Sequence, residues 1–265
     1  MKRLMRIVMC IKSVKKELVY QEDEYQENYV MNPYDLYALQ NIIEAKKQGT
    51  EMICMSMGPE AVTDTLRRCI ALGVDEVIQL SDKHFAGADT IATSYVLKKA
   101  IEKIGNVDLI CCGQKTVDGE TGQVVYALSE QLNIPCLSQV ESITDLNQDT
   151  ISIERVNGDC SEKIQVGLPA VISYRNCTTI YKKINLLRLK RAQNHKIVVW
   201  NMNDLQIDPS MCGQKGSKTI VQSVKKHHAI IKKEQTILDG DIKDTVHVVK
   251  NIILGKDNGV CLYGE

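Results

Sequence analysis

The stretch VDLICCGQKTVDGETGQVVY, residues 107–126, joins an apolar run to a polar loop that contains glycines. The run Val107–Cys112 is typical of a buried strand in a parallel sheet. The polar loop Gln114–Gly119 follows it, and we expect a helix to begin at Glu120 or Thr121. Because the first N–H groups of a helix lack internal partners and lie at the positive end of its dipole, such a helix start attracts phosphate.

An ordinary strand-to-helix connection would give the same spacing, so the residues alone leave both interpretations open. Two familiar phosphate-binding fingerprints are absent from the sequence. No Gly-Lys-Ser/Thr follows the loop, and the chain contains no GxGxxG.

The composition is that of a soluble globular protein, with 44% hydrophobic and 25% charged residues. The formal net charge is +0, so no excess of positive charge predicts nucleic-acid binding. No apolar run approaches the roughly 18 residues of a membrane span, and the start Met1–Arg6 lacks the apolar region of a signal peptide. We therefore expect a cytoplasmic protein that binds neither nucleic acid nor membrane.

The ten cysteines are scattered through apolar segments and form no CxxC pair. The adjacent Cys111 and Cys112 would face opposite sides of a strand. This distribution is typical of reduced thiols packed as small hydrophobic side chains in a cytosol, and a metal or redox site is the alternative.

Strands and helices alternate along the first part of the chain. Asn32 and Pro33 mark a helix start, because Asn favours the N-cap and Pro the first helical position. Buried strands are expected at Leu4–Ile11, Glu51–Met57, Val77–Leu80, Val107–Cys112 and Ala170–Tyr174. This alternation predicts a doubly wound, mainly parallel α/β sheet with right-handed crossovers. Ligands bind at the carboxyl ends of such strands, so the loop Lys12–Lys16 is a candidate binding wall, with a solvated basic loop as the alternative.

From Cys136 onward the pattern changes to short alternating segments. Val140–Ile143, Thr150–Arg155 and Lys163–Val166 are separated by turn residues, which predicts antiparallel hairpins added to the sheet. The basic stretch Leu186–Arg191 fits either a surface helix or a contact with a partner protein.

The composition changes again near residue 208. Residues 208–218 have the composition of a linker or surface loop, and a strand at Thr219–Val224 and an amphipathic helix at Ile242–Leu254 are expected beyond it. We therefore divide the chain into a body, residues 1–207, and a linker with a C-terminal arm, residues 208–265.

Five short motifs resemble the beta subunit of electron transfer flavoproteins. They are MNPYD at 31–35, SMGP at 56–59, FAGADT at 85–90, CGQK at 112–115 and DGETGQV at 118–124. They occur in the family's order and on the expected elements, and the resemblance extends from about residue 4 to 200.

The resemblance implies an adenine-nucleotide-binding fold like that of nucleotide hydrolases and universal stress proteins. It implies a heterodimer with an alpha subunit that carries FAD. Some beta subunits of the family hold a structural AMP; others hold a second FAD, receive a hydride from NADH and take part in electron bifurcation. Gly87–Thr90 and Asp118–Thr121 look more like the second type. Its further partners are a flavin-containing dehydrogenase and a low-potential acceptor, ferredoxin or flavodoxin.

The resemblance also implies which residues line the sites. For the cofactor these are Ile11, Lys12, Ser13, Met57, Gly58, Asp89, Thr90, Thr93, Gly113, Gln114, Asp118, Gly119, Glu120, Thr121, Gly122, Gln123 and Val124. The loop Gly119–Val124 would cradle the pyrophosphate, with Gly122 leaving room for close backbone approach. For the partner they are Ile184, which aligns with the family's recognition leucine, with Leu186 and Leu187.

The sequence departs from the bifurcating pattern at two places. Ser13–Lys16 reads SVKK where the family has Gln-Val-Pro-Asp, and Arg175–Tyr181 keeps only the tyrosine of Asn-Glu-Pro-Arg-Tyr. Two alternatives to the FAD-binding subunit follow: a non-bifurcating subunit with AMP, and a flavin-free, stress-type nucleotide-binding protein. No catalytic constellation is predicted, because the five histidines do not recur beside the motif residues.

Overall fold

The computed structural model describes residues 4–16, 29–177, 184, 186–220, 222 and 241–253. The chain divides into two units, Met1–Ile220 and Val221–Glu265. The first unit carries the α/β fold, and the described part of the second is mainly helix α7, Ile242–Ile253. Within the described ranges, no helix is both long and apolar enough to cross a membrane.

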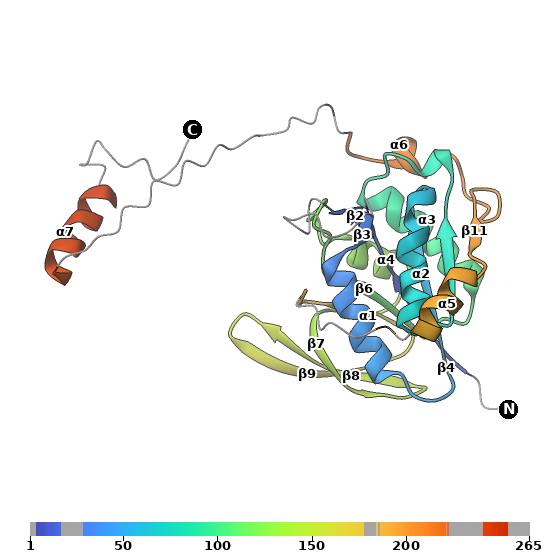
Figure 1. Cartoon of the computed structure of the whole chain (residues 1–265), viewed down its shortest axis with the longest axis horizontal. Coiled ribbons are helices and arrows are strands. Elements are labelled where there is room, and N and C mark those ends of the chain that lie inside the picture. Colours follow the sequence, from blue (N-terminus) through green and yellow to red (C-terminus); the bar gives the residue numbers. More distant parts are fainter. Residues whose placement is uncertain are drawn as a thin grey trace. The chain divides into compact units, whose positions relative to one another are not determined.

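A nine-stranded sheet in the order β11-β5-β4-β1-β6-β10-β7-β8-β9 forms the centre of the first unit (Figure 1). Neighbouring strands are parallel from β11 to β7, whereas β8 and β9 continue the sheet as antiparallel strands. The strands are β1 Met5–Cys10, β4 Thr50–Met57, β5 Glu76–Leu80, β6 Leu109–Gly113, β7 Cys136–Leu146, β8 Thr150–Asn157, β9 Cys160–Gly167, β10 Ala170–Tyr174 and β11 Val198–Trp200. The predicted fold class, a doubly wound and mainly parallel α/β sheet with added hairpins, is confirmed.

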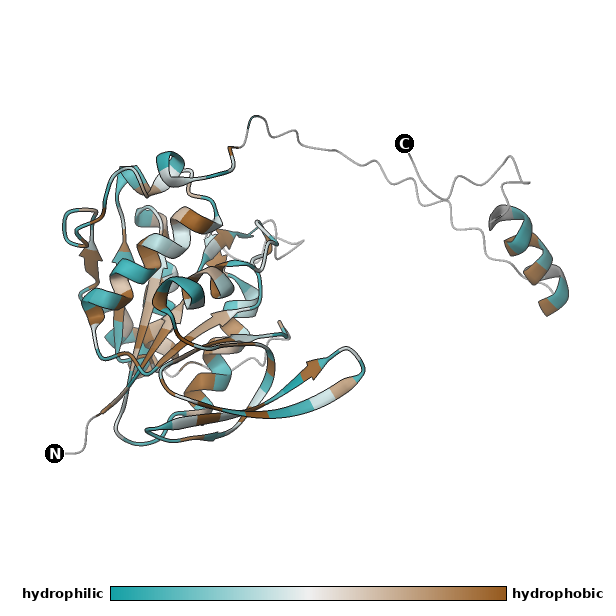
Figure 2. Cartoon of the chain, turned by 180° about the vertical axis from the view of Figure 1, so that it is seen from behind, coloured by the Kyte–Doolittle hydropathy of each residue, from teal (hydrophilic) through white to brown (hydrophobic). Residues whose placement is uncertain are grey.

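Helices cover both faces of the parallel strands. They are α1 Pro33–Ala45, α2 Thr63–Leu72, α3 Thr90–Ile104, α4 Val124–Leu132, α5 Leu186–Asn194 and α6 Gly213–Gly216, with 3-10 turns at Glu60–Val62 and Lys83–Phe85. The buried residues of α1 and α2 share one hydrophobic cluster with one face of the sheet, and those of α3 and α4 share a second cluster with the other face. Apolar residues are accordingly concentrated on the central strands (Figure 2).

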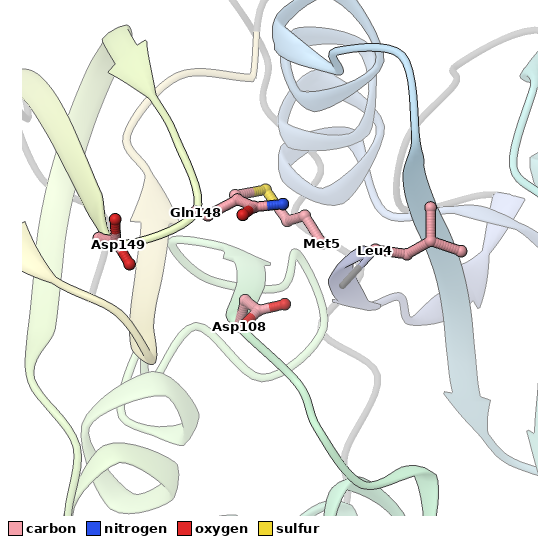
Figure 3. A pocket seen from close by; sticks show the side chains of 5 residues that line it. All are labelled: Leu4, Met5, Asp108, Gln148 and Asp149. Atoms are coloured by element: carbon pink, nitrogen blue, oxygen red, sulfur yellow. The ribbon is translucent and has the colours of Figure 1, made fainter. Parts of the chain in front are cut away.

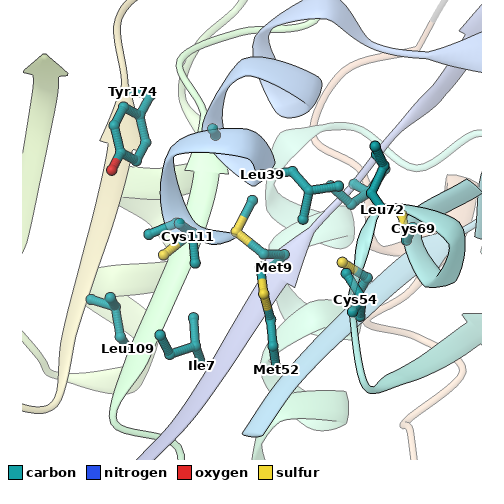
Figure 4. Close-up of a cluster of buried hydrophobic side chains, with 14 of the residues drawn as sticks. Ile7, Met9, Leu39, Met52, Cys54, Cys69, Leu72, Leu109, Cys111 and Tyr174 are labelled. Atoms are coloured by element: carbon teal, nitrogen blue, oxygen red, sulfur yellow. The ribbon is translucent and has the colours of Figure 1, made fainter. Parts of the chain in front are cut away.

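The first cluster is rich in sulfur-containing side chains. Met9, Met52 and Cys54 are fully buried and belong to the same cluster as Leu39 of α1 (Figure 4). Their polarisable side chains fill the space between sheet and helix as small or adaptable hydrophobes. The described cysteines form no disulfide.

A short antiparallel ribbon follows β1 that the sequence did not indicate. Ser13–Lys15 forms β2 and pairs with β3, Tyr29–Met31. The segment predicted as the loop Lys12–Lys16 is therefore largely a strand. The signal is weak because three residues are too few for a period to be read.

The C-terminal part of the first unit folds back over the second hydrophobic cluster. Leu205, Ile207 and Cys212 are buried in it. Within residues 208–218, predicted as a linker or surface loop, Gly213–Gly216 forms the short helix α6. Thr219 and Ile220 are not in a strand, and most of the predicted strand 219–224 lies outside the described residues. The assignment of residues 208–265 to a partner-binding arm stays a prediction.

The core makes a quantitative prediction at Leu39, which has no exposed surface. Replacing it by alanine removes buried methyl groups and leaves a cavity, so Leu39→Ala is expected to lower the free energy of unfolding by about 2–5 kcal/mol. Urea denaturation of the full chain measures the change. Leu189→Ala is the matched control, because Leu189 is 43% exposed, and its loss should stay below about 1 kcal/mol. Equal losses in the two variants would contradict this account of the core.

Candidate functional site

The candidate site lies where the order of connection in the sheet reverses. The chain passes from β1 through α1 to β4 on one side, whereas β6 lies on the other side of β1. The loops that leave β1 and β6 therefore diverge at the carboxyl edge, which is where ligands bind in open α/β sheets. Both predicted binding segments, the loop after β1 and the loop after β6, meet here.

The loop after β6 stays non-helical for longer than predicted. Helix α4 begins at Val124, with Gln123 at its N-cap, and not at Glu120 or Thr121. The reason is local: Glu120 has φ 51° and Gly122 has φ 62°, both in the left-handed region. Two left-handed residues cannot continue a right-handed helix, so the helix starts only after them.

Gly122 is required by its own backbone conformation. A side chain there would be strained at φ 62°, and a Cβ atom would lie 3.2 Å from the carbonyl oxygen of Gln114. Its replacement therefore disturbs the loop itself. The sequence-based view that Gly122 mainly leaves room for a ligand is incomplete.

Hydrogen-bond donors converge at the start of α4. The N–H groups of its first residues have no partner within the helix, and the Gln123 N–H donates to Thr121 Oγ1 at 3.4 Å. Thr121 Oγ1 lies 3.4 Å from Thr90 Oγ1, and Thr90 is the first residue of α3. The start of α4 and the two hydroxyl groups thus lie together, an arrangement that suits phosphate oxygens.

The acidic side chains of the loop are paired with lysines. Lys12 Nζ lies 2.8 Å from the Asp118 carboxylate, and Lys115 Nζ lies 3.2 Å from Glu120. Partial burial acts to raise the pKa of Asp118, but the hydrogen bonds from Lys12 and Thr116 and the positive charge of Lys12 together outweigh it, and the pKa lies below its usual value. The two lysines offset the two carboxylates, so these acids do not repel a phosphate group strongly.

Two glycines at the strand ends are explained by packing within the protein. A Cβ atom at Gly58 would lie 2.5 Å from Val62 Cγ1, and one at Gly113 would lie 2.5 Å from Asp35 Oδ1. Neither glycine needs a ligand to account for it.

Asp89 has its carboxylate engaged by the protein's own backbone. Its Oδ1 caps α3 by accepting from the N–H groups of Ile91 and Ala92, each at 3.0 Å. Its Oδ2 accepts from the N–H groups of Lys218 at 2.6 Å and Thr219 at 3.1 Å. Burial acts to raise the pKa of Asp89, but these four donors outweigh it and lower the pKa. The side chain predicted to contact the cofactor therefore anchors the segment after α6.

The remaining predicted cofactor residues lie at the same edge of the sheet but differ in what they contact. The Ser13 hydroxyl bonds to Thr65 of α2, 2.7 Å away. The N–H groups of Ile11 and Gln114 donate to neighbouring strands, to Met55 and Tyr174. Met57 ends β4 and packs against the second cluster, and Thr93 lies in the first turn of α3. The cofactor role of these residues stays a prediction.

The predicted partner residues also differ from one another. Ile184 is partly buried and packs against the first hydrophobic cluster. Leu186 and Leu187 of α5 are 82% and 76% exposed. Tyr181, which the resemblance also uses, lies outside the described residues.

A separate hollow lies at the opposite edge of the sheet. It is lined by Leu4, Met5, Asp108, Gln148 and Asp149 (Figure 3). Met5 begins β1 and Asp108 directly precedes β6, so the hollow is at the amino ends of these strands. It does not coincide with the site at the carboxyl ends. Among the described residues, no group of three His, Cys, Asp or Glu is placed to hold a metal ion.

Sequence reasoning missed the role of Asn32. It occupies the N-cap position of α1, as predicted, but its side chain makes no capping hydrogen bond. It bonds instead to the loop after β6, to the Lys115 carbonyl oxygen at 2.9 Å and the Val117 N–H at 3.3 Å. The motif MNPYD held the signal, but a local pattern does not reveal a bond to residues more than 80 positions away.

A doubly wound sheet with hydrogen-bond donors at the carboxyl edge, where the loops after β1 and β6 diverge, is typical of the nucleotide-binding α/β proteins. Comparison with known proteins specifies the family. The chain matches the electron transfer flavoprotein domain over residues 19–205. It therefore belongs to the electron transfer flavoprotein family, as the motifs indicated.

Three relatives place it beside the beta-type subunits. It is 33% identical over 235 residues to protein FixA of Azorhizobium caulinodans, covering 83% of this chain and 84% of that protein. It is 33% identical over 226 residues to the caffeyl-CoA reductase-Etf complex subunit CarD of Acetobacterium woodii, with coverage of 82% and 86%. It is 34% identical over 219 residues to the electron transfer flavoprotein subunit beta of Thermoanaerobacterium thermosaccharolyticum, with coverage of 82% and 83%.

The contacts of Asp89 predict that the variant Asp89→Asn keeps the cap of α3 and loses the bonds to the segment after α6. Asparagine caps helices as well as aspartate does, so the Ile91 and Ala92 amides should keep their protection. The new NH2 group would face the N–H groups of Lys218 and Thr219, which lose their acceptor. Their amide exchange is expected to quicken roughly tenfold or more, since a bond to a charged group contributes about 1.5–3 kcal/mol.

Asp82→Asn is the matched control for this exchange experiment. Asp82 caps the turn at His84 with Oδ1, and its Oδ2 accepts from the Met202 N–H at 3.0 Å. It should affect Met202 and leave residues 218 and 219 unchanged. Unaltered exchange at Lys218 and Thr219 in Asp89→Asn would mean that the carboxylate is not their anchor.

Proposed function

We propose that this chain is the beta subunit of an electron transfer flavoprotein heterodimer in the cytoplasm and that it binds FAD. The observation that carries the proposal is the position of the Thr90 and Thr121 hydroxyl groups, 3.4 Å apart, beside the start of α4, in a chain of this family. The N–H groups that begin α4 and these two hydroxyls bind the phosphates. The similarity to CarD, a subunit of a caffeyl-CoA reductase-Etf complex, supports a role beside a dehydrogenase or reductase.

In the full proposal, electrons pass from NADH to a partner dehydrogenase and to a low-potential acceptor, ferredoxin or flavodoxin. When bound, FAD would supply the redox chemistry, and the protein supplies orientation and electrostatics. This chain's own residues hold the phosphates and, through the Lys12–Asp118 pair, connect the two loops of the site. The exposed Leu186 and Leu187 are the proposed contact with the dehydrogenase.

The alternative is a subunit that holds AMP at the same phosphate site. The observation that favours it is the loop after β1: Ser13–Lys15 forms a strand, and Ser13–Lys16 lacks the proline and the acid of the bifurcating pattern. Donors at a helix N-terminus accept the phosphate of either nucleotide. The flavin-free, stress-type alternative is disfavoured by the family match.

The nucleotide site is tested by removing its two hydroxyl groups. The heterodimer is prepared with this chain as wild type and as the double variant Thr90→Val with Thr121→Val. FAD and AMP per heterodimer are counted, and affinities are then measured by titration. Each lost charge-assisted bond contributes about 1.5–3 kcal/mol, so affinity should fall at least roughly tenfold.

Thr63→Val is the matched control, because Thr63 is also the first residue of a helix, α2, and its hydroxyl group donates to Gln79 Oε1 at 3.3 Å. It should bind nucleotide as the wild type does. Two flavins per wild-type heterodimer support the FAD proposal, and one flavin with one AMP supports the alternative. Unchanged affinity in the double variant would move the phosphate site to the loop after β1.

A truncation tests the proposed role of the C-terminal arm in assembly. The first unit ends at Ile220, and a chain ending there keeps the Asp89 contacts to Lys218 and Thr219. α7 has exposed Ile242, Val246 and Val249, an apolar surface of the kind that binds a partner. Removing residues 221–265 is expected to leave the melting temperature of the first unit nearly unchanged and to abolish co-purification with the alpha subunit. Full retention of the heterodimer would show that the arm is not its clamp.

A further inference from the structure

Two buried polar residues at the start of α1 face the loops of the site. Asn32 is 0% exposed and Asp35 is 4% exposed. Asn32 is the N-cap residue of α1 and Asp35 lies in its first turn, positions where such residues ordinarily cap the helix or favour its dipole. In this chain the Asn32 side chain does not cap α1.

Asn32 holds both loops at once. Its backbone N–H donates to the Lys12 carbonyl oxygen at 2.9 Å. Its side-chain NH2 donates to the Lys115 carbonyl oxygen at 2.9 Å, and its side-chain oxygen accepts from the Val117 N–H at 3.3 Å. One residue therefore connects the end of β1 with the segment that leads to the proposed phosphate donors.

Asp35 joins the two strand ends directly. Its Oδ2 accepts from the Lys12 N–H at 2.8 Å, and its Oδ1 accepts from the Gly113 N–H at 3.0 Å. Lys12 follows β1 and Gly113 ends β6. A side chain at residue 113 would collide with Asp35 and with Tyr34, so the fit is close.

We infer that Asn32 and Asp35, together called the α1 brace, are positioning residues that fix the spacing of the two loops and thereby set nucleotide affinity. We infer further that affinity weakens when the Asp35 carboxylate takes up a proton. The inference rests on the proposed function, because the affinity in question is that of the proposed phosphate site. The brace itself does not touch the phosphate donors; it acts through the backbone of Lys12, Gly113, Lys115 and Val117.

Protonation would break one of the two backbone bonds. A carboxylate accepts at both oxygens, whereas a carboxylic acid places an O–H donor on one of them. That O–H would face an N–H donor, either that of Lys12 or that of Gly113, and the two strand ends would no longer be held equally. Burial raises the pKa of Asp35 to about 7, against hydrogen bonds from Lys12, Asn32 and Gly113 that act to lower it.

The neighbouring groups titrate away from neutrality. A hydrogen bond with Cys10 and burial raise the pKa of the Cys112 thiol, burial raises that of Tyr34, and the bond to Glu120 raises that of Lys115. The pKa of Asp118 lies below its usual value. Lys12 contributes its positive charge beside Asp35. A change in affinity centred near pH 7 would therefore be assigned to Asp35.

The experiment measures FAD and AMP affinity of the nucleotide-depleted heterodimer between about pH 6 and 8.5. The pH profile for FAD is the decisive one, because the phosphate monoester of AMP has a pKa of about 6 of its own. Wild-type affinity for FAD is expected to fall below about pH 7, by at most about tenfold per pH unit for one linked proton. Asp35→Asn is expected to bind more weakly than wild type at pH 8 and to show no such pH dependence.

The variant Asn32→Ala tests the positioning of the loops without removing the carboxylate of Asp35 that titrates. It removes the side-chain bonds to Lys115 and Val117 but leaves the Asp35 carboxylate, so affinity should fall while the pH profile is kept. Asp64→Asn is the matched control, since Asp64 is an exposed acid in the first turn of α2. It should resemble the wild type. If Asp35→Asn does not fold, the wild-type pH profile still tests the proton linkage, and Asn32→Ala still tests the positioning role.

The outcomes distinguish the brace from the proposed function. A wild-type heterodimer that binds neither FAD nor AMP overturns the proposed function and the inference with it. Binding that depends on Thr90 and Thr121 but is flat between about pH 6 and 8 overturns the proton-linked part. Wild-type affinity in both Asn32→Ala and Asp35→Asn overturns the brace and leaves the proposed function standing.

Discussion

The rest of the site depends on one buried carboxylate that holds two diverging strands. At the switch point the backbones leaving β1 and β6 separate, and each leaves an N–H group that a neighbouring strand does not accept. Asp35 accepts both of them, from Lys12 and Gly113. An unpaired N–H group in this position would itself be costly.

The raised pKa of Asp35, about 7, shows that burial disfavours the charge, and an unfolded chain would lose that proton at lower pH. Between about pH 4 and 7 the folded state therefore retains a proton that the unfolded state has lost, and the contribution of Asp35 to stability falls as the pH rises.

The loop after β6 places hydrogen-bond donors at this carboxyl edge of the sheet. Its anchor is Asn32, which bonds to Lys115 and Val117. Beyond that anchor the left-handed residues Glu120 and Gly122 delay the helix until Val124. The delay leaves Thr121 in the loop, where its hydroxyl group lies 3.4 Å from that of Thr90 of α3. A helix beginning at Glu120 would have placed the donors elsewhere.

The sequence was sufficient for the features that depend on local pattern. Apolar runs bounded by glycine and proline predicted the parallel strands, and the turn residues predicted the hairpins β7 to β9. Ala170–Tyr174 was predicted with its observed bounds. The helix start at Val124 was missed because a left-handed Glu120 has no signature in residue type. The roles of Asn32 and Asp89 were missed because their partners lie 83 to 130 residues away, and no periodicity encodes that distance.

The acidic residues of the motifs bond to donors of the protein itself, which the local sequence pattern does not reveal. Asp35 and Asp89 accept hydrogen bonds from backbone N–H groups, and Asp118 accepts one from the Lys12 ammonium group. Asp82 repeats the Asp89 arrangement, with one oxygen capping a turn and the other holding the segment after β11. A carboxylate facing a phosphate would add repulsion between like charges, so acids are poor candidates for direct phosphate contact. Their use as acceptors for the protein's own donors leaves the N–H groups of α4 and the hydroxyls of Thr90 and Thr121 as the groups suited to the ligand. A motif rich in Asp and Gly can therefore mark a phosphate site whose acidic residues shape the backbone around the phosphate and do not touch it.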